Sequence, residues 1–322
     1  MPDSTQLHIV TGKGGTGKTT IAASLAMALA DKGKKVLLCE VEGRQGIAQL
    51  FDVPPLPYEE RKVAVGLGGG QVFALAIDPE AALLEYLQMY YKLGRAGRAL
   101  DRFGIIDFAT TIAPGVRDVL LTGKVYEAAR RRTGKAFTYD AVILDAPPTG
   151  RITRFLNVNS EVAGLAKVGP IRRQSDSIMK MMRAPETHVH LVTVLEEMPV
   201  QETLDGITAL KSEHLPVGTV IVNQVRDSPL PKGGLDRLRT HKVASADVER
   251  SLKKAGLSEI DADDFILEGE RHAQRQSLQD AQRSVLATGD QPVAEVPYLT
   301  DGVDLGALFE LAEILKTEVL DG

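Results

Sequence analysis

Residues 12–20 read Gly-Lys-Gly-Gly-Thr-Gly-Lys-Thr-Thr, which is a phosphate-binding loop of the form G-x-x-x-x-G-K-S/T. Leu7 to Val10 before the loop predict a short buried strand, and Thr19 to Ala30 after it predict an alanine-rich helix without a breaker. The alternative is a glycine-rich turn that matches by accident. Because a strand before the loop and a helix after it are the context that the motif requires, the segment predicts nucleotide binding.

Each residue type in the loop suits this chemistry. The glycines allow the backbone to turn with its N–H groups inward, around an anion at the positive end of the following helix. We expect Lys18 to reach the β- and γ-phosphates, and the Thr19 hydroxyl to bind Mg²⁺. The loop residues predicted to contact the nucleotide are Gly14, Gly15, Thr16, Gly17, Lys18, Thr19 and Thr20.

A second lysine, Lys13, occupies the second position of the loop. A side chain there would point away from the phosphates of its own loop in a simple P-loop fold, so it needs a target elsewhere. The alternative is an exposed loop lysine without a role.

Composition limits the classes of protein that fit. With 322 residues and 43% hydrophobic content, the chain can bury the core of one large domain with an insertion, or of two domains. A net charge of −5 favours neither nucleic acid nor an anionic membrane as a partner. The single cysteine, Cys39, excludes an intramolecular disulfide and fits a reducing compartment, so we expect a cytoplasmic protein. Neither an N-terminal signal sequence nor an apolar run long enough to span a bilayer is recognisable.

Short runs rich in Val, Ile and Leu recur along the chain, with helical stretches between several of them. This alternation predicts an α/β fold with a doubly wound, mostly parallel sheet that helices cover on both faces. A helix from Leu305 to Val319 would close the chain. Besides Leu7 to Val10, the runs are Lys35 to Val41, Val72 to Ile77, Ala141 to Asp145, Val189 to Leu195, Thr219 to Val225 and Ala294 to Tyr298.

The interval between Ile77 and Ala141 is too long for one crossover helix, which predicts an inserted helical subdomain. Helices are expected over Glu80 to Leu93 and Val116 to Arg132, and a third helical stretch lies between Asn157 and Glu186. We therefore assign residues 79–135 and 157–185 to the subdomain, and residues 1–78, 136–156 and 186–322 to the P-loop core. The methionines near 180 suit an adaptable apolar groove, although methionine also fills cores. The predicted groove residues are Leu87, Tyr91, Met179 and Met182.

The composition of four other segments indicates their structure. The glycines at 66 and 68–70 predict a flexible link rather than a second phosphate loop, because neither a strand before them nor a helix after them is apparent. Residues 226–264 are polar and weakly periodic, which indicates a surface insertion, and a long polar helix is expected over Phe265 to Ala287. The acidic final helix is a poor anchor for an anionic membrane.

Asp145 ends an apolar strand and is followed by Ala-Pro-Pro-Thr-Gly. An acid at that position can hold Mg²⁺ through a water molecule, and the adjacent turn can move when the γ-phosphate leaves. The alternative is an acid that only begins a turn.

The pattern G-K-G-G-x-G-K-T-T resembles the deviant P-loop of the family that contains cell-division and plasmid-partition ATPases, nitrogenase iron protein, arsenite-pump ATPases and tail-anchored-protein targeting ATPases. Residues 145–156 are similar to the second switch of the arsenite-pump and targeting branch, and residues 76–83 and 114–115 look like its signature stretches. The resemblance implies an Mg-dependent ATPase in which Lys13 reaches the phosphates of a dimer partner. It also implies that Asn223, Pro297 and Tyr298 lie around the adenine.

The chain departs from that branch at three points. Glu42 in Glu-Gly-Arg-Gln stands where the family has the aspartate of Asp-Pro-Ala-His, so a longer carboxylate would orient the attacking water. The Cys-x-x-Cys that clamps zinc between targeting subunits is missing, and Cys39 alone cannot supply the thiolates that arsenite requires. We therefore expect neither a zinc site nor an iron-sulfur cluster.

The resemblance implies a dimeric ATP-dependent switch, with Lys13, Lys18, Glu42 and Asp145 as catalytic residues. Its helical subdomain would hold an apolar or membrane-protein client segment, and its partner would be an identical chain or a paralogous ATPase. Two alternatives remain open, an energising ATPase subunit of an anion transporter and a partition or positioning ATPase. The second would predict a basic patch that the sequence lacks, and nucleic-acid binding is not expected.

Overall fold

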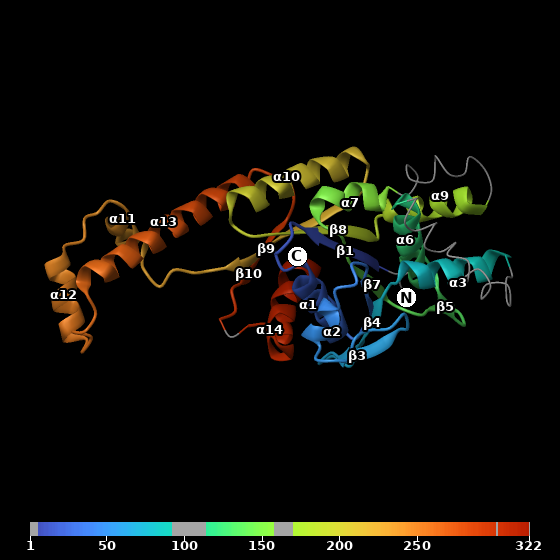
Figure 1. Cartoon of the computed structure of the whole chain (residues 1–322), viewed down its shortest axis with the longest axis horizontal. Helices are drawn as coiled ribbons and strands as arrows, with labels where there is room; N and C mark the ends of the chain where they lie inside the picture. Colours follow the sequence, from blue (N-terminus) through green and yellow to red (C-terminus); the bar gives the residue numbers. More distant parts are fainter. Residues whose placement is uncertain (1–5, 92–113, 158–169, 301, 322) are drawn as a thin grey trace.

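A computed structural model describes residues 6–91, 114–157, 170–300 and 302–321. Its centre is an eight-stranded sheet in which every neighbouring pair is parallel except β3 with β4, which confirms the predicted α/β fold (Figure 1). The strands, in spatial order, are β10 (Val293–Pro297), β9 (Val217–Val225), β8 (Thr187–Thr193), β1 (Gln6–Gly12), β7 (Ala141–Asp145), β2 (Lys35–Glu40), β4 (Gln71–Ala76) and β3 (Arg61–Val65).

The strand register places the carboxyl ends of β1, β7 and β2 side by side. In β7, Asp145 is the Cα partner of Val10 in β1 on one side and of Glu40 in β2 on the other. Ligands of open α/β sheets bind beyond the carboxyl ends of the strands, so this edge positions the site.

Helices cover both faces of the sheet. On one face lie α1 (Lys18–Asp31) and α14 (Leu305–Leu315), which pack against each other, and on the other lie α7 (Thr149–Leu156) and α10 (Glu197–Ser212). Eleven of the 14 residues of α1 are buried, because its alanines allow close approach to the strands. The last predicted helix ends its α-helical part at Leu315, and the wider turn η1 (Lys316–Leu320) follows.

The glycine-rich segment 66–70 is the loop of a β-hairpin between β3 and β4, so the prediction of a flexible link without a preceding strand is wrong. The Gly66 amide donates to the Gly70 carbonyl at 2.9 Å, and the Gly70 amide donates to the Ala30 carbonyl at 3.1 Å. A Cβ on Gly68 would lie 1.9 Å from the Asp31 carbonyl oxygen, so glycine is needed for this close approach. Strand β3 went unpredicted because an exposed edge strand lacks alternating apolar residues.

The helical layer beside the core consists of α3 (Pro79–Tyr91), α6 (Pro114–Arg130) and α9 (Pro170–Met182), and α6 packs against α3, α7 and α9. A small hairpin of β5 (Arg132–Thr133) and β6 (Ala136–Phe137) follows α6. Met179 and Met182 are 2% and 0% exposed and belong to the core, which corrects the prediction that they line an open groove. The side chains of the other two predicted groove residues, Leu87 and Tyr91, lie outside the described residues.

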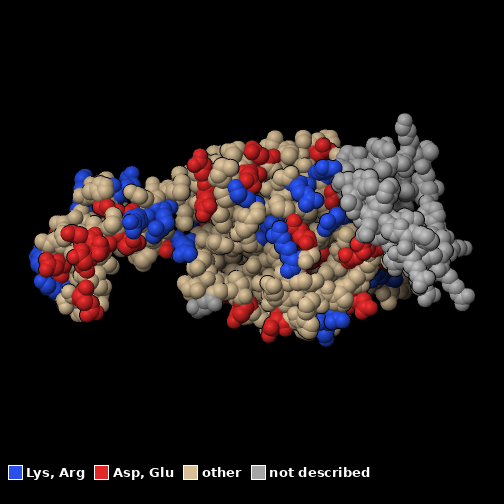
Figure 2. All heavy atoms as spheres, viewed as in Figure 1, with Lys and Arg blue, Asp and Glu red and all other residues tan. Residues whose placement is uncertain are grey.

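The polar segment after β9 forms part of an arm that projects from the core, at the left of Figure 1. Helices α11 (Lys232–Arg239) and α12 (Ser245–Lys254) pack against α13 (Ala262–Leu286), which runs back to the core. This helix begins three residues before the predicted start, because the Asp261 carboxylate caps it by accepting from the amides of Asp263 and Asp264. Charges of both signs are interspersed on the face of the molecule that Figure 2 shows. None of the described helices has the length and apolar character needed to cross a bilayer.

Candidate nucleotide-binding site

The phosphate loop joins β1 to α1, as the sequence predicts. Gly15 and Gly17 have φ values of +87° and +88°, a left-handed conformation that favours glycine. The Thr16 amide and hydroxyl both donate to the Lys13 carbonyl, at 3.3 and 2.9 Å, which closes the turn. In the part of the chain that the structure describes, no side chain caps the N-terminus of α1, so its first N–H groups remain available to an anion.

The Lys18 side chain is shielded from water and lies close enough to Asp145 to lower the pKa of that carboxyl. Lys18 is 7% exposed, and it forms no hydrogen bond or ion pair with any residue that the structure describes. An ammonium group so shielded from water is unfavourable without a negative partner. The loop is therefore suited to receive phosphate oxygens at Lys18.

Asp145 lies against the start of α1. Its Oδ2 accepts a hydrogen bond from the Thr19 hydroxyl at 2.7 Å, while its Oδ1 is buried without a hydrogen-bond partner among the described residues. Burial raises the pKa of Asp145 from 3.8 to about 6, opposed by the hydrogen bond from Thr19 and by the charge of Lys18. A hydroxyl and a partly unsatisfied carboxylate together are the oxygen donors that Mg²⁺ prefers, so Thr19 and Asp145 fit the predicted metal site.

A second buried carboxylate, Glu40, was missed by the sequence analysis. It ends β2 beside Asp145 and is 2% exposed. Its Oε1 accepts from the Gln45 amide at 2.6 Å and its Oε2 from the Ile47 amide at 3.4 Å, so it fixes the start of helix α2 (Gly46–Leu50). The reasoning that selected Asp145, an acid that ends an apolar strand, applies equally to Glu40.

Glu42 lies beside the predicted second switch, residues 145–156. It lines a cavity of about 160 Å³ with Pro147 and Arg151, which follow Asp145, and with Asp118 of α6. An Arg44 nitrogen is 3.8 Å from its carboxylate, and its side chain is 22% exposed. The charge of Glu42 is close enough to Asp145 to raise the pKa of that residue. Glu42 thus lies beside the site, and no hydrogen bond from a described residue fixes its carboxylate.

Lys13 points away from the cradle formed by its own loop. Its ammonium donates to Glu202 Oε1 of α10 at 2.6 Å, and the two side chains are 32% and 37% exposed. Glu202 is 189 residues away in sequence, so no local pattern could have identified it.

The residues predicted around the adenine occupy the other side of the loop. Asn223 is 6% exposed, and its Nδ2 donates to the Thr16 carbonyl at 2.9 Å. Pro297 ends β10, and the ring of Tyr298 is covered by the Arg226 guanidinium at 3.5 Å. The structure thus joins Asn223 directly to the loop, whereas Pro297 and Tyr298 lie farther along the same edge.

Cys39 is poorly suited to bind a soft metal ion. Cys39 is fully buried, and burial raises the pKa of its thiol, which disfavours the thiolate that binds soft metals. Within the described ranges, no group of three or more His, Cys, Asp or Glu side chains could hold a metal ion.

Comparisons with known proteins agree with this geometry. A sequence profile of the anion-transporting ATPase family matches residues 5–186. ATPase BagA of Mycobacterium tuberculosis is 53% identical over 316 residues, which cover 97% of this chain and 93% of that protein. A putative arsenical pump-driving ATPase of Chlorobaculum tepidum is 25% identical over 269 residues, covering 70% of this chain and 63% of that protein. ATPase GET3 of Eremothecium gossypii is 27% identical over 286 residues, covering 78% and 79%.

The profile covers more than half of the chain and includes the phosphate loop, Glu42 and Asp145. Membership implies ATP as the substrate and Mg²⁺ as its companion ion, for which Lys18, Thr19 and Asp145 are suitably placed. The chain belongs to the anion-transporting ATPase family and is a P-loop enzyme that hydrolyses ATP.

Proposed function

We propose that the chain is a dimeric ATP-driven switch in which Lys13 of one subunit completes the nucleotide site of its partner. The observation that carries this proposal is the position of Lys13. Its ammonium lies at the surface on Glu202, outside its own phosphate cradle, although it belongs to the same loop. A cation there is free to meet negative charge on a second subunit once it leaves Glu202.

Each residue of the site would have a separate role in phosphoryl transfer. Lys18 would neutralise the β- and γ-phosphates, while Thr19 and Asp145 would hold Mg²⁺, which would supply further positive charge for phosphoryl transfer. Glu42 would accept a hydrogen bond from the attacking water and align it with the γ-phosphate. The partner's Lys13 would add positive charge where it develops on the transferred group, which favours hydrolysis only in the closed dimer.

The helical subdomain would respond to the nucleotide through α7. This helix begins at Thr149, four residues after Asp145, and its Arg151 lies 3.8 Å from Asp118 of α6. The same segment is joined to β1 by the hydrogen bond from the Thr11 hydroxyl to the Pro147 carbonyl at 2.7 Å. These contacts support a path from the γ-phosphate to α6, and we propose that α3, α6 and α9 hold an apolar client segment in the cytoplasm.

A subunit-mixing experiment tests the role of Lys13. Neither Lys13→Ala nor Lys18→Ala alone should hydrolyse ATP, because each lacks one of the two lysines that every site needs. An equimolar mixture of the two variants should regain about a quarter of wild-type activity, since half of the dimers are mixed and each mixed dimer has one competent site of two. The matched control mixes Lys18→Ala with a chain that carries both substitutions, and it should stay inactive.

The partner of this chain could also be a paralogous ATPase, so the mixing is repeated with a co-encoded homologue. Activity that is not restored in either pairing contradicts action of Lys13 on a second subunit.

A second experiment tests client binding. The Glu42→Gln variant, held in ATP, should retain an apolar segment that ADP releases. A trapped complex that contains only soluble, polar partners would contradict client binding.

An energising subunit of an anion transporter is the second candidate, which the family description and the arsenical pump-driving relative favour. It predicts a membrane protein that remains bound to the trapped form in both nucleotide states. Arsenite itself is a poor candidate for the transported species, because Cys39 is buried and its thiol is held protonated.

A further inference from the structure

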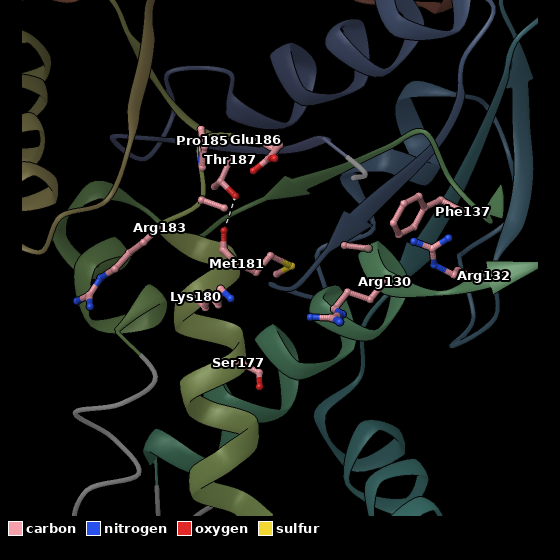
Figure 3. A pocket seen from close by; sticks show the side chains of 12 residues that line it. Arg130, Arg132, Phe137, Ser177, Lys180, Met181, Arg183, Pro185, Glu186 and Thr187 are labelled. Atoms are coloured by element: carbon pink, nitrogen blue, oxygen red, sulfur yellow. Dashed lines mark hydrogen bonds between the residues drawn. The ribbon is translucent and has the colours of Figure 1, made fainter. Parts of the chain in front are cut away.

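A second cavity, of about 950 Å³, lies between the end of α6, the β5–β6 hairpin, the second half of α9 and the start of β8 (Figure 3). This volume is typical of pockets that hold small organic molecules. The Thr187 hydroxyl donates to the Met181 carbonyl at 2.7 Å, which ties the end of α9 to β8 and fixes this wall. The cavity is thus built from elements that the fold holds together.

Cationic side chains dominate the lining. They are Arg130, Arg132, Lys180 and Arg183, and the single carboxylate among the lining residues is that of Glu186. In Figure 3, Lys180 of α9 extends toward the space from one side, and Arg130 and Arg132 extend toward it from the other. Arg183 turns away, and its Nε donates to the Glu213 carbonyl at 3.1 Å. Three cations therefore face the cavity.

These three cations lack carboxylate partners in the described part of the chain. Arg132 donates to the Lys135 carbonyl at 2.8 Å and lies 4.0 Å over the Phe137 ring, and Arg130 lies 5.3 Å over the Tyr126 ring. Lys180 makes no hydrogen bond or ion pair with any described residue. Both arginines keep N–H groups for a ligand, and guanidinium groups match the oxygen geometry of phosphate and carboxylate.

Apolar side chains complete the walls. Phe137 faces Met181 and Pro185 across the cavity. Ala129 and Ala184 also belong to the lining. A small inorganic anion would leave these surfaces unpaired, and an apolar molecule would leave the cations without negative charge. The lining therefore matches a ligand that combines an anionic group with an apolar body.

We propose that this cavity binds an amphiphilic organic anion, with its phosphate or carboxylate at Arg130, Arg132 and Lys180 and its apolar part against Phe137 and Met181. The site is separate from the ATP site. The cavity is at the start of β8, whereas the phosphate loop is at the carboxyl end of the sheet, roughly 20 Å away over the seven residues of that strand. Binding should therefore occur without nucleotide.

Isothermal titration of the full chain with octyl phosphate, below the concentration at which it forms micelles, tests the proposal. Octyl phosphate should bind measurably more tightly than inorganic phosphate or octanol, and rising salt should weaken it. The Arg130→Ala/Lys180→Ala variant should lose at least about tenfold in affinity, since two charged hydrogen-bond donors are removed. Lys211→Ala, on the exposed surface of α10, is the matched control and should bind like wild type.

ATP hydrolysis and the melting temperature verify that each variant is folded, because neither substituted residue belongs to the nucleotide site. Equal binding of octanol and octyl phosphate, or unchanged affinity in the double variant, would overturn the proposal. Vesicles of phosphatidylglycerol and of phosphatidylcholine separate a soluble ligand from a membrane surface. Sedimentation with the anionic vesicles without any binding of soluble octyl phosphate would also overturn it.

Discussion

The carboxylate of Asp145 is held in an environment that opposes its own charge, and this can be measured. Burial raises its pKa from 3.8 to about 6. At about 1.4 kcal/mol per pKa unit, ionised Asp145 destabilises the metal-free fold by about 3 kcal/mol. Asp145→Asn removes this penalty but places an NH₂ group where the buried Oδ1 has no partner, at a cost of about 1–2 kcal/mol. We expect a net gain of about 1–2 kcal/mol.

The pH dependence follows from the direction of the pKa shift. Below about pH 4 the carboxyl is protonated in both the folded and the unfolded chain, so its penalty is absent. As the pH rises, the unfolded chain loses its proton first, and the fold loses stability until the folded carboxyl ionises near pH 6. The advantage of Asp145→Asn should therefore be largest at pH 8 and should disappear, or become a deficit, near pH 4.

Thermal denaturation in EDTA without nucleotide measures this difference. At pH 8 the variant should melt about 1.5–3 °C above wild type, given about 1.5 °C per kcal/mol for a chain of 322 residues. The same variant should lose ATP hydrolysis by about a hundredfold or more, because the neutral amide binds Mg²⁺ poorly. A variant that melts at or below wild type at pH 8 would refute the idea that the site destabilises its empty form.

Three further changes address the loop and the sheet. Gly17→Ala should abolish nucleotide binding, because φ is +88° and the new Cβ would lie 2.3 Å from Asn223 Nδ2. Adding Asn223→Ala should recover part of the lost stability, measured by chemical denaturation, but should not restore nucleotide binding. Glu202→Gln should change stability by less than about 0.5 kcal/mol, since the pair is partly exposed, yet should strengthen ATP-dependent dimerisation in light scattering. Burial lowers the pKa of His190 to about 3, so below pH 6.5 the unfolded chain binds a proton that the folded chain does not. The free energy of unfolding of wild type should therefore fall by about 1.4 kcal/mol per pH unit through this residue. His190→Gln should show a smaller fall in melts at decreasing pH.

How much the sequence predicts depends on how local the determining contacts are. The phosphate loop was predictable because nine consecutive residues hold its turn, its lysine and the hydroxyl that contacts Asp145. Asp145 was predictable because an acid that ends a buried strand is visible in the sequence. Glu202 was not, because its contact with Lys13 spans 189 positions and depends on the placement of α10.

The range of the determining contacts also decides which parts of the fold were predicted wrongly. The buried parallel strands were predicted within about two residues, since their apolar runs reflect burial on both faces. Strand β3 exposes most of its side chains at the sheet edge, so its sequence carries no such pattern. Met179 and Met182 were assigned to a groove because composition alone cannot distinguish an adaptable surface from a well-packed core.

The phosphate loop is held from three sides by residues that the sheet order brings to it. Asp145 reaches Thr19 from β7, Asn223 reaches Thr16 from β9, and Glu202 reaches Lys13 from α10. Phosphate and Mg²⁺ would compete with the first of these contacts, and a partner subunit would compete with the last. Asn223 lies at the end of the strand that leads into the arm, whereas Asp145 precedes the helix that contacts α6. Under the proposed function, nucleotide binding at this loop would influence the arm through β9 and the helical layer through α7.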